Sequence, residues 1–485
     1  MTFATVEELV GDLGPAAHLA NGVVVVNDAS AFRGTLTDEL VWAAVFHPDE
    51  ALRGACRWLI WSASQALGCG SASIQGLYHA RGQGAFAATR FTTPAINVRA
   101  ATYLTARQAF AAATAAEVGA LIFEIARSEM AYTDQRPDEY ATVILAAAVR
   151  EGWRGPVFLQ GDHFQFNPTR WQADPVAEMT GIRDLVREAI EAGFLNIDID
   201  SSTLVDLTRT TVSEQQRTNA DTTAQVTRLI RSLQPEGVEI SVGGEIGEVG
   251  KTNSTEEELR AFLGEYAASR HPDGRAVGLS KVSIQTGTSH GGVPLPDGTV
   301  APVQLDFETL RRLSDVARAE YHLAGCVQHG ASTLPEEAFG HFPAVGCAEI
   351  HLATGFQNIL YDGGGLPAAL RAEMMAWCTE HCADERKVGE SEGQFLYRTR
   401  KKALGPFKRK LWALDAGAQA EIGANLRAQF ALLFDRLGAT GTRELVERHV
   451  EAAPVPRPMP PALGGAWRQV VGAGTSALAD DGSGE

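Results

Sequence analysis

From about residue 72, short apolar runs alternate with amphipathic stretches along the chain. The apolar runs have the length of buried strands and cover residues 94–98, 120–125, 156–160, 194–200, 238–245, 278–285, 324–328 and 348–352. Stretches with the apolar period of a helix lie between them, at residues 106–118, 138–151, 175–192, 220–233, 256–268, 307–321 and 335–342. Eight such units predict a closed, parallel TIM (β/α)8 barrel of the α/β class, because an open doubly wound sheet rarely repeats so evenly.

The residues on either side of the predicted barrel have a different pattern. Residues 1–71 read as a helical N-terminal extension, which we interpret as a cap or an oligomer contact. We place the barrel at residues 72–415 and further C-terminal helices at residues 416–452. Residues 453–485 are rich in Pro, Gly, Ala and Asp, a composition that predicts a poorly ordered tail.

The charge and the cysteine content narrow the class of protein. A formal net charge of -17 argues against nucleic acid or an anionic membrane as the main partner, since both select basic surfaces. No uncharged apolar run reaches the roughly 18 residues of a membrane-spanning helix, and the acidic N-terminus does not resemble a signal peptide. The 6 cysteines contain no CxxC pair. These features indicate a cytoplasmic protein.

Three histidines follow apolar runs and lie close to glycines: His163, His290 and His329. The carboxyl ends of barrel strands meet at one rim, so these imidazoles are expected to lie together. Three neutral imidazoles are a ligand set for one zinc-like ion that keeps an open coordination position. The sequence therefore predicts a metal site at this rim.

The residue types near these histidines suggest the chemistry. A metal that holds a ketone oxygen can stabilise the enediolate formed when a neighbouring C–H or C–C bond breaks. Asp162, next to His163, is the candidate to carry the proton in that step. Asp200 and Glu245, at the ends of neighbouring runs, are candidates to bind a second cation or to orient the ligands.

Small and hydroxyl residues follow the seventh and eighth runs, at residues 330–332 and 354–355. Loops at this place hold a phosphate in many β/α barrels, through their backbone N–H groups. We therefore expect an anion site there. The candidate substrate-binding residues are Asn97, Gly291, Gly330, Ser332, His351 and Thr354.

The order of these motifs resembles the class II, metal-dependent fructose-bisphosphate aldolases and their tagatose-bisphosphate relatives over residues 72–415. The matching segments are PAINV at 94–98, DH at 162–163, IDSS at 199–202, EIG at 245–247, GTSHG at 287–291, VQHGAS at 327–332 and KKALGP at 401–406. The resemblance implies that His163, His290 and His329 are zinc ligands and that Asp162 is the proton donor. It places Asp200 and Glu245 near an alternative metal position.

The chain departs from this family around the substrate. The family's mobile loop glutamate, which takes the substrate proton, has no direct counterpart, and Glu248 is the nearest acid. His351 stands where the family's Asn contacts the reacting triose, and Ala353 stands where its Asp contacts the sugar chain. The lysine after the family's "HGxY" is missing, and Ala126 aligns with its serine after the second strand. The resemblance thus implies the family's metal site in this chain, but it does not imply fructose bisphosphate as the substrate.

Three functions follow from this comparison. The first is zinc-dependent aldol cleavage and condensation of a ketose phosphate, a glycolysis-like lyase of carbohydrate metabolism, in a homo-oligomer (a dimer or higher) such as this family commonly forms. The second is a metal-dependent sugar or sugar-phosphate isomerase or epimerase, suggested by the missing loop glutamate. The third is a non-catalytic barrel subunit of an aldolase complex. We rank it last because all three predicted zinc ligands are present.

Overall fold

The computed structural model describes residues 3–20, 22–247, 252–270, 277–287, 305–332, 334–451 and 453–477, with side chains up to residue 469. Its centre is a closed barrel of eight parallel strands in chain order, which confirms the predicted fold. The strands are β4 (Thr93–Asn97), β5 (Ile122–Ala126), β6 (Val157–Gln165), β7 (Asn196–Asp200), β8 (Ser241–Gly247), β9 (Lys281–Ile284), β10 (Cys326–Gln328) and β11 (Glu349–Leu352). The barrel closes where β11 pairs with β4.

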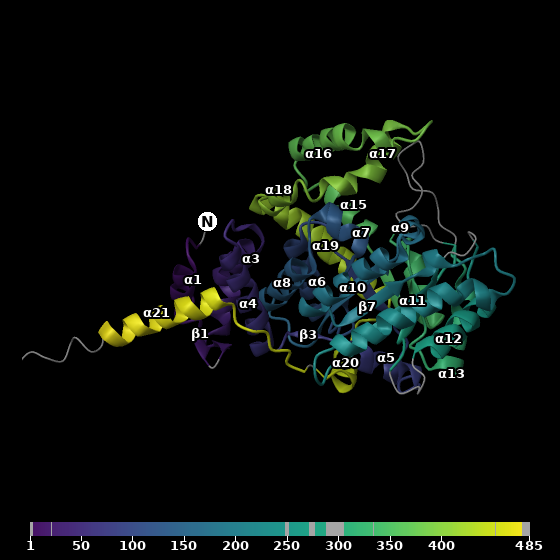
Figure 1. Cartoon of the computed structure of the whole chain (residues 1–485). Coiled ribbons are helices and arrows are strands. Elements are labelled where there is room, and N and C mark those ends of the chain that lie inside the picture. The colour runs from purple at the N-terminus through teal and green to yellow at the C-terminus, as the bar shows by residue number, and fades with distance from the viewer. Residues whose placement is uncertain are drawn as a thin grey trace, which may run out of the picture.

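The helices between the strands form the outer layer of the barrel (Figure 1). They are α6 (Thr102–Ala115), α7 (Arg127–Thr133), α8 (Pro137–Arg150), α9 (Pro168–Ala173), α10 (Pro175–Glu191), α11 (Val212–Leu233), α12 (Glu256–Arg270), α13 (Phe307–Tyr321) and α15 (Thr354–Asp362). The helix expected at 335–342 is instead a 3-10 turn, η3 (Glu336–Gly340), followed by α14 (His341–Ala344). His341 and Phe342 begin α14, so the apolar pattern there covers two short elements rather than one helix.

Local capping explains where individual helices begin. At the start of α12, the Thr255 hydroxyl accepts a hydrogen bond from the Glu258 backbone N–H at 3.2 Å. In return the Glu258 carboxylate accepts the Thr255 N–H at 2.7 Å. This reciprocal pair satisfies two donors that the helix leaves free, and the acids of the first turn favour its positive end.

The N-terminal extension consists of α1 (Val6–Asp12), α2 (Ala29–Ala31), η1 (Phe32–Leu36), α3 (Thr37–Phe46) and α4 (Glu50–Ala66), together with a hairpin of β1 (Ala17–Ala20) and β2 (Val23–Val26). The all-helical prediction was therefore wrong at the hairpin. Four consecutive valines favour a strand, and Gly22 supplies the positive φ of the turn (79°). The Val24 N–H donates to the Ser62 hydroxyl of α4 at 2.9 Å, so α4 holds the hairpin in place.

The C-terminal part contains α16 (Ala368–His381), η4 (Ala383–Glu385), α17 (Glu392–Thr399), η5 (Arg400–Ala403), α18 (Lys408–Trp412), α19 (Ala416–Arg436), α20 (Arg443–His449) and α21 (Pro461–Ala477). The smaller elements β3 (Ser71–Ala72), α5 (Gln75–Gly82) and η2 (Ser202–Leu204) lie at the two ends of the barrel. No helix in the described part of the chain has the length and hydropathy that a membrane span requires.

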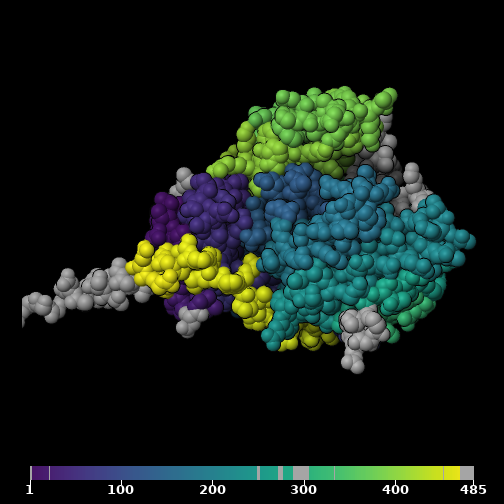
Figure 2. All heavy atoms as spheres, in the orientation of Figure 1, coloured from purple at the N-terminus to yellow at the C-terminus, as the bar shows by residue number. Residues whose placement is uncertain are grey.

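The segment that was predicted to be a poorly ordered tail contains the helix α21 and is ordered from residue 453 to residue 477, so the prediction made from composition was wrong there. Two tryptophans of α4 hold it: the Trp61 indole donates to the Val455 carbonyl at 2.9 Å, and the Trp58 indole donates to the Arg457 carbonyl at 3.1 Å. The helix α21 then contacts α1, so the two ends of the described chain lie side by side (Figures 1 and 2). Contacts with a distant part of the chain thus order a segment that composition alone would leave flexible.

Candidate metal and acid–base site at the barrel rim

A bulge in β6 directs two adjacent side chains to the same face. β6 runs through Asp162 and His163 rather than ending before them, and its register with β7 shifts between Gly161 and Phe164. Neighbouring residues of a regular strand point to opposite faces, and a bulge changes this alternation. His163 adopts a positive φ of 40° at the bulge. A Cβ atom on Gly161 would lie 2.5 Å from the Phe164 ring, so this backbone path requires glycine.

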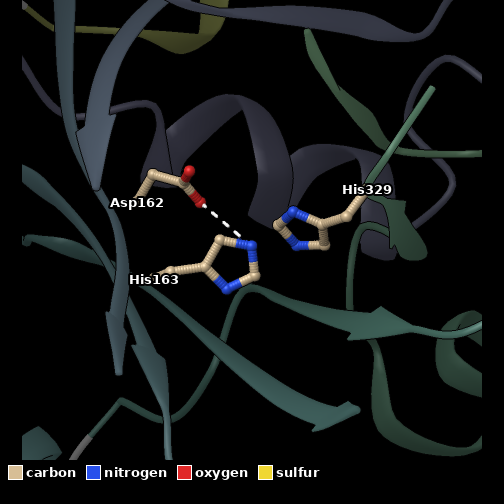
Figure 3. A group of neighbouring side chains, drawn as sticks. All are labelled: Asp162, His163 and His329. Carbon is tan, nitrogen blue, oxygen red and sulfur yellow. Dashed lines mark ion pairs between the residues drawn. The ribbon is translucent and has the colours of Figure 1, made fainter. Parts of the chain in front are cut away.

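His329 follows β10 and faces this pair across the barrel, as Figure 3 shows. The ring centroids of His163 and His329 lie 4.1 Å apart, and the His163 Nε2 atom lies 3.7 Å from Asp162 Oδ1. One donor atom from each of these three residues fits within 4.8 Å of the others, a spacing that suits one metal ion. His290, the third predicted imidazole, lies outside the described residues, as do Gly291 and Glu248.

Two predicted acids lie on the other side of the His163 ring. The Nδ1 atom of His163 is 3.2 Å from Asp200 Oδ2 and 3.1 Å from Glu245 Oε2. These three residues form a second group with metal-ligand spacing. A carboxylate on one imidazole nitrogen fixes which nitrogen is free to bind a metal, so Asp200 and Glu245 can orient His163 as well as bind a cation themselves.

The electrostatics of this group follow from burial and from its high charge density. Burial, and then the negative charge of Asp200, raise the pKa of Glu245 to about 7. Burial also disfavours the charged form of Asp200, but hydrogen bonds from His163 and Ser202 outweigh it and hold the pKa of Asp200 below its ordinary value. The pKa of His163 is well above its ordinary value, because Asp162 and Glu245 overcome the effect of burial. Protons therefore compete with a metal ion for this site.

Both oxygens of the Asp162 carboxylate have a partner from a predicted site residue. The amide of Asn97 donates to Oδ2 at 3.3 Å, and the Nδ1 atom of His351 lies 3.0 Å from Oδ1. The centroid of the His351 ring lies 4.1 Å from that of the His329 ring. Although burial opposes it, the charges of Glu124 and Asp162 raise the pKa of His351 well above its ordinary value, so His351 is a donor to Asp162. The structure thus brings the predicted Asn97, Asp162 and His351 together.

A second charged layer, which was not predicted from the sequence, lies deeper in the barrel. The Lys281 ammonium, only 1% exposed, lies 2.9 Å from Asp198 Oδ2 and donates to Gln160 Oε1 at 2.7 Å. It also forms a very short ion pair with Glu349. Glu349 in turn lies 2.6 Å from the Nε2 atom of His351, so this layer supports the rim from below.

Strand alternation is the signal that could have revealed this layer. The segments Asn196–Asp200 and Glu349–Leu352 alternate polar and apolar residues although both strands are buried. In a barrel strand one of the two faces points into the interior, so polar residues at every second position predict a polar interior. The functional residues predicted from the sequence, by contrast, all lie at or just after strand ends.

The two loops of the predicted anion site lie next to each other. The Ser332 hydroxyl accepts a hydrogen bond from the Ala353 N–H at 2.6 Å and so joins the loop after β10 to the loop after β11. The guanidinium of Arg99 donates to the Thr354 hydroxyl at 3.4 Å and pairs with Glu129 at 2.6 Å. Arg99, directly after the PAINV segment, is not among the residues predicted from the sequence. It adds guanidinium donors next to the predicted loops, and Glu129 balances its charge.

The fold and this site define a barrel protein with histidine–carboxylate groups at the carboxyl ends of its strands that could hold a metal ion. The family model described as fructose-bisphosphate aldolase class-II matches residues 84–403. The chain therefore belongs to the class II fructose-bisphosphate aldolase family, which confirms the resemblance drawn from the motifs. No curated protein matches the chain.

The chain is also similar to solved structures, all at low sequence identity. A probable tagatose 6 phosphate kinase from Sinorhizobium meliloti 1021 is 18% identical with a TM-score of 0.50, over 79% of this chain and 98% of that one. The fructose-bisphosphate aldolase of Campylobacter jejuni is 16% identical (TM-score 0.45, 77% and 96% covered). The fructuronate-tagaturonate epimerase UxaE of Cohnella laeviribosi is 12% identical (TM-score 0.49, 72% and 82% covered).

Proposed function

We propose that the protein is a zinc-dependent aldolase that cleaves and forms a C–C bond of a ketose phosphate. The observation that carries the proposal is the grouping of Asp162, His163 and His329 within metal-ligand distance at the barrel rim. It combines two imidazoles with an acid that can carry a proton, and a class II aldolase reaction needs both.

His163 and His329 would hold the metal, and His290 is the third ligand that we propose from the sequence. When bound, the metal supplies electrostatic stabilisation of the negative charge that develops on a substrate ketone oxygen. Asp200 and Glu245 keep the His163 ring oriented through its Nδ1 atom. The donor set fits zinc, since imidazole nitrogens and carboxylate oxygens are its usual ligands alongside thiolates.

Asp162 moves the proton in this proposal. In the cleavage direction it accepts the proton of the hydroxyl next to the breaking C–C bond, so that carbon leaves as an aldehyde and the electron pair stays on the ketone fragment. In the condensation direction it returns the proton to the new hydroxyl. Asn97 and His351 each hold one oxygen of its carboxylate and so fix its orientation. We assign protonation of the remaining fragment to Glu248, the nearest acid to the family's loop glutamate.

The substrate anion is assigned to the joined loops. Hydrogen-bond donors come from the backbone at Gly330, from the hydroxyls of Ser332 and Thr354 and from the guanidinium of Arg99. A phosphate ester matches these groups because backbone N–H groups and a guanidinium both donate to its oxygens. A ketose phosphate therefore fits both halves of the site.

The test is aldehyde release from a panel of ketose mono- and bisphosphates before and after chelation. Cleavage should disappear in the metal-free protein and return with zinc or cobalt. His163→Ala should lose the activity, whereas His381→Ala, a change at an exposed histidine of α16, should keep it. Full cleavage by the metal-free protein would refute the proposal.

His351 favours a second candidate, a metal-dependent sugar or sugar-phosphate isomerase or epimerase. Its imidazole lies 3.0 Å from Asp162, so the site has two groups that can exchange protons on one face. Incubation with ketoses in deuterated water separates the two functions. Deuterium uptake with sugar interconversion and without aldehyde release would favour the isomerase or epimerase.

A further inference from the structure

An arginine-lined cavity lies at the end of the barrel opposite the metal site. Its volume is about 380 Å³. Three segments bound it, and each leads into a strand of the barrel. The end of α5 and residues 84–90 precede β4, α13 precedes β10, and residues 343–346 precede β11. In Figure 1, α5 and α13 accordingly lie at the bottom of the barrel, and α15, which begins at the rim, lies at the top. None of the groups assigned above to the rim lines this cavity.

Positive charge dominates the cavity although the chain as a whole is acidic. Its lining includes four arginines and one carboxylate: Arg81, Arg90, Arg311, Arg318 and Asp315. Asp315 is shared, at 3.0 Å from the Arg311 guanidinium and 2.7 Å from that of Arg318. Glu308 also pairs with Arg311. In the described part of the chain, Arg81 and Arg90 form no ion pair, so positive charge is in excess around the cavity.

Backbone carbonyls hold the two innermost arginines in place, and Asp315 also holds Arg318. Arg81 donates to the Cys347 carbonyl at 2.9 Å and lies over the Phe91 ring, 5.2 Å from its centroid. Arg318 donates to the Gly346 carbonyl at 2.6 Å. Burial, and then the nearby Arg318 charge, lower the pKa of Arg81 to about 10, so Arg81 is still cationic at neutral pH. A bound anion would relieve their mutual repulsion.

We propose that this cavity is a binding site for a phosphate group, either free or as a small phosphate ester. Guanidinium groups match phosphate through two parallel hydrogen bonds, and here the surrounding backbone already fixes two of them. The volume falls within the roughly 300–1,000 Å³ of small-molecule sites. A nucleic acid is a poorer match, because the net charge of -17 on the chain repels a polyanion.

The location gives the site a route to the barrel rim. Arg81 and Arg318 bind carbonyls of residues 346 and 347, and the chain continues directly into β11. β11 carries Glu349 and His351, which form the charged layer and contact Asp162. An occupant that changes the hydrogen bonds of these arginines therefore acts on the strand that supports the reacting acid.

The test is calorimetric titration of the full chain with inorganic phosphate, pyrophosphate and a sugar phosphate. The double variant Arg90→Gln/Arg311→Gln should bind phosphate at least roughly tenfold more weakly, because each lost guanidinium removes a charged hydrogen-bond donor. Asp315→Asn should bind it more tightly, because this change frees Arg311 and Arg318 from their shared acid. A preference for the sugar phosphate over free phosphate would identify the ester as the ligand.

Two controls separate this site from other anion sites. Arg183→Gln/Arg187→Gln removes two arginines from a surface depression between α10 and α11 and should leave binding unchanged. Ser332→Ala weakens only binding at the rim, so the cavity remains measurable whether or not the proposed aldolase activity is found. Wild-type affinity in the correctly folded Arg90→Gln/Arg311→Gln variant, or no binding of any of the three anions by the wild type at millimolar concentration, would overturn the proposal.

Discussion

Replacing Lys281 by methionine removes the only ammonium group from the charged layer inside the described barrel. Its Nζ atom contacts Gln160 at 2.7 Å and Asp198 at 2.9 Å and forms a very short ion pair with Glu349. Methionine has a similar length and fills the space of the aliphatic chain. The change therefore removes the charge and its hydrogen bonds while keeping most of the packing.

The expected loss of stability follows from these three contacts. A hydrogen bond to a charged group contributes about 1.5–3 kcal/mol, and breaking a buried ion pair costs about 3–5 kcal/mol because the remaining charge is left unpaired. Protonation of the acids left behind limits the cost. We therefore expect Lys281→Met to lower the free energy of unfolding by about 3–5 kcal/mol near pH 8.

The loss should shrink as the pH falls. Although burial opposes it, Lys281 and His351 hold the pKa of Glu349 at about 2, below its ordinary value of 4.5. Glu349 thus contributes stability that is present above its ordinary pKa and is lost as the pH falls toward 2. Burial raises the pKa of Asp198 to about 6, and without Lys281 the cost of ionising both acids increases. At about pH 5 the variant can protonate them, which reduces its deficit.

Urea unfolding of wild type and variant, followed by tryptophan fluorescence at both pH values, measures this difference. Lys410→Met is the matched control, since its partner Glu373 is exposed, and we expect a change of about 0–1 kcal/mol there. A Lys281→Met variant within about 1 kcal/mol of wild type would contradict the argument from the unpaired buried charge. An equal deficit at both pH values would contradict the titration argument.

Three further predictions concern the rim. His329→Ala should lower zinc retention after dialysis by at least roughly tenfold, measured by elemental analysis. The control His381→Ala, at an exposed histidine, should retain zinc. Equal zinc contents in the two variants would exclude His329 as a ligand. Asp162→Asn should reduce kcat by about 10²–10⁴ while zinc content stays constant, and an unchanged kcat would remove Asp162 from the proton transfer. Gly161→Ala should lower the free energy of unfolding by about 1–3 kcal/mol, because the new methyl group would lie 2.5 Å from the Phe164 ring. It should also weaken zinc binding. Wild-type stability and zinc binding in this variant would show that the β6 bulge does not depend on glycine.

Much of the barrel could be predicted from the sequence because its signals are local. Each strand of the barrel lies within or overlaps a predicted apolar run, and the polar residues at the strand ends gather at one rim because all barrel strands point the same way. For this reason Asp162, His163 and His329 come together as expected. Asn97 and His351 join them for the same reason.

Other features depend on contacts between distant parts of the chain. The charged layer unites Lys281, Asp198 and Glu349 from three strands, and barrel closure with its exact register decides which of them meet. The order of α21 depends on α1 and on the tryptophans of α4. The arginine cavity joins the end of α5 to α13, more than two hundred residues later in the chain.

The sequence by itself determined the barrel, its rim and the kinds of residue that lie there. Only the tertiary structure decided how those residues are paired. A strand pattern fixes which face a side chain occupies, but the distance between two side chains depends on register, bulges and closure, which no single strand encodes. The histidine–carboxylate group at the rim could therefore be predicted, whereas the charged layer beneath it and the cavity at the opposite end could not.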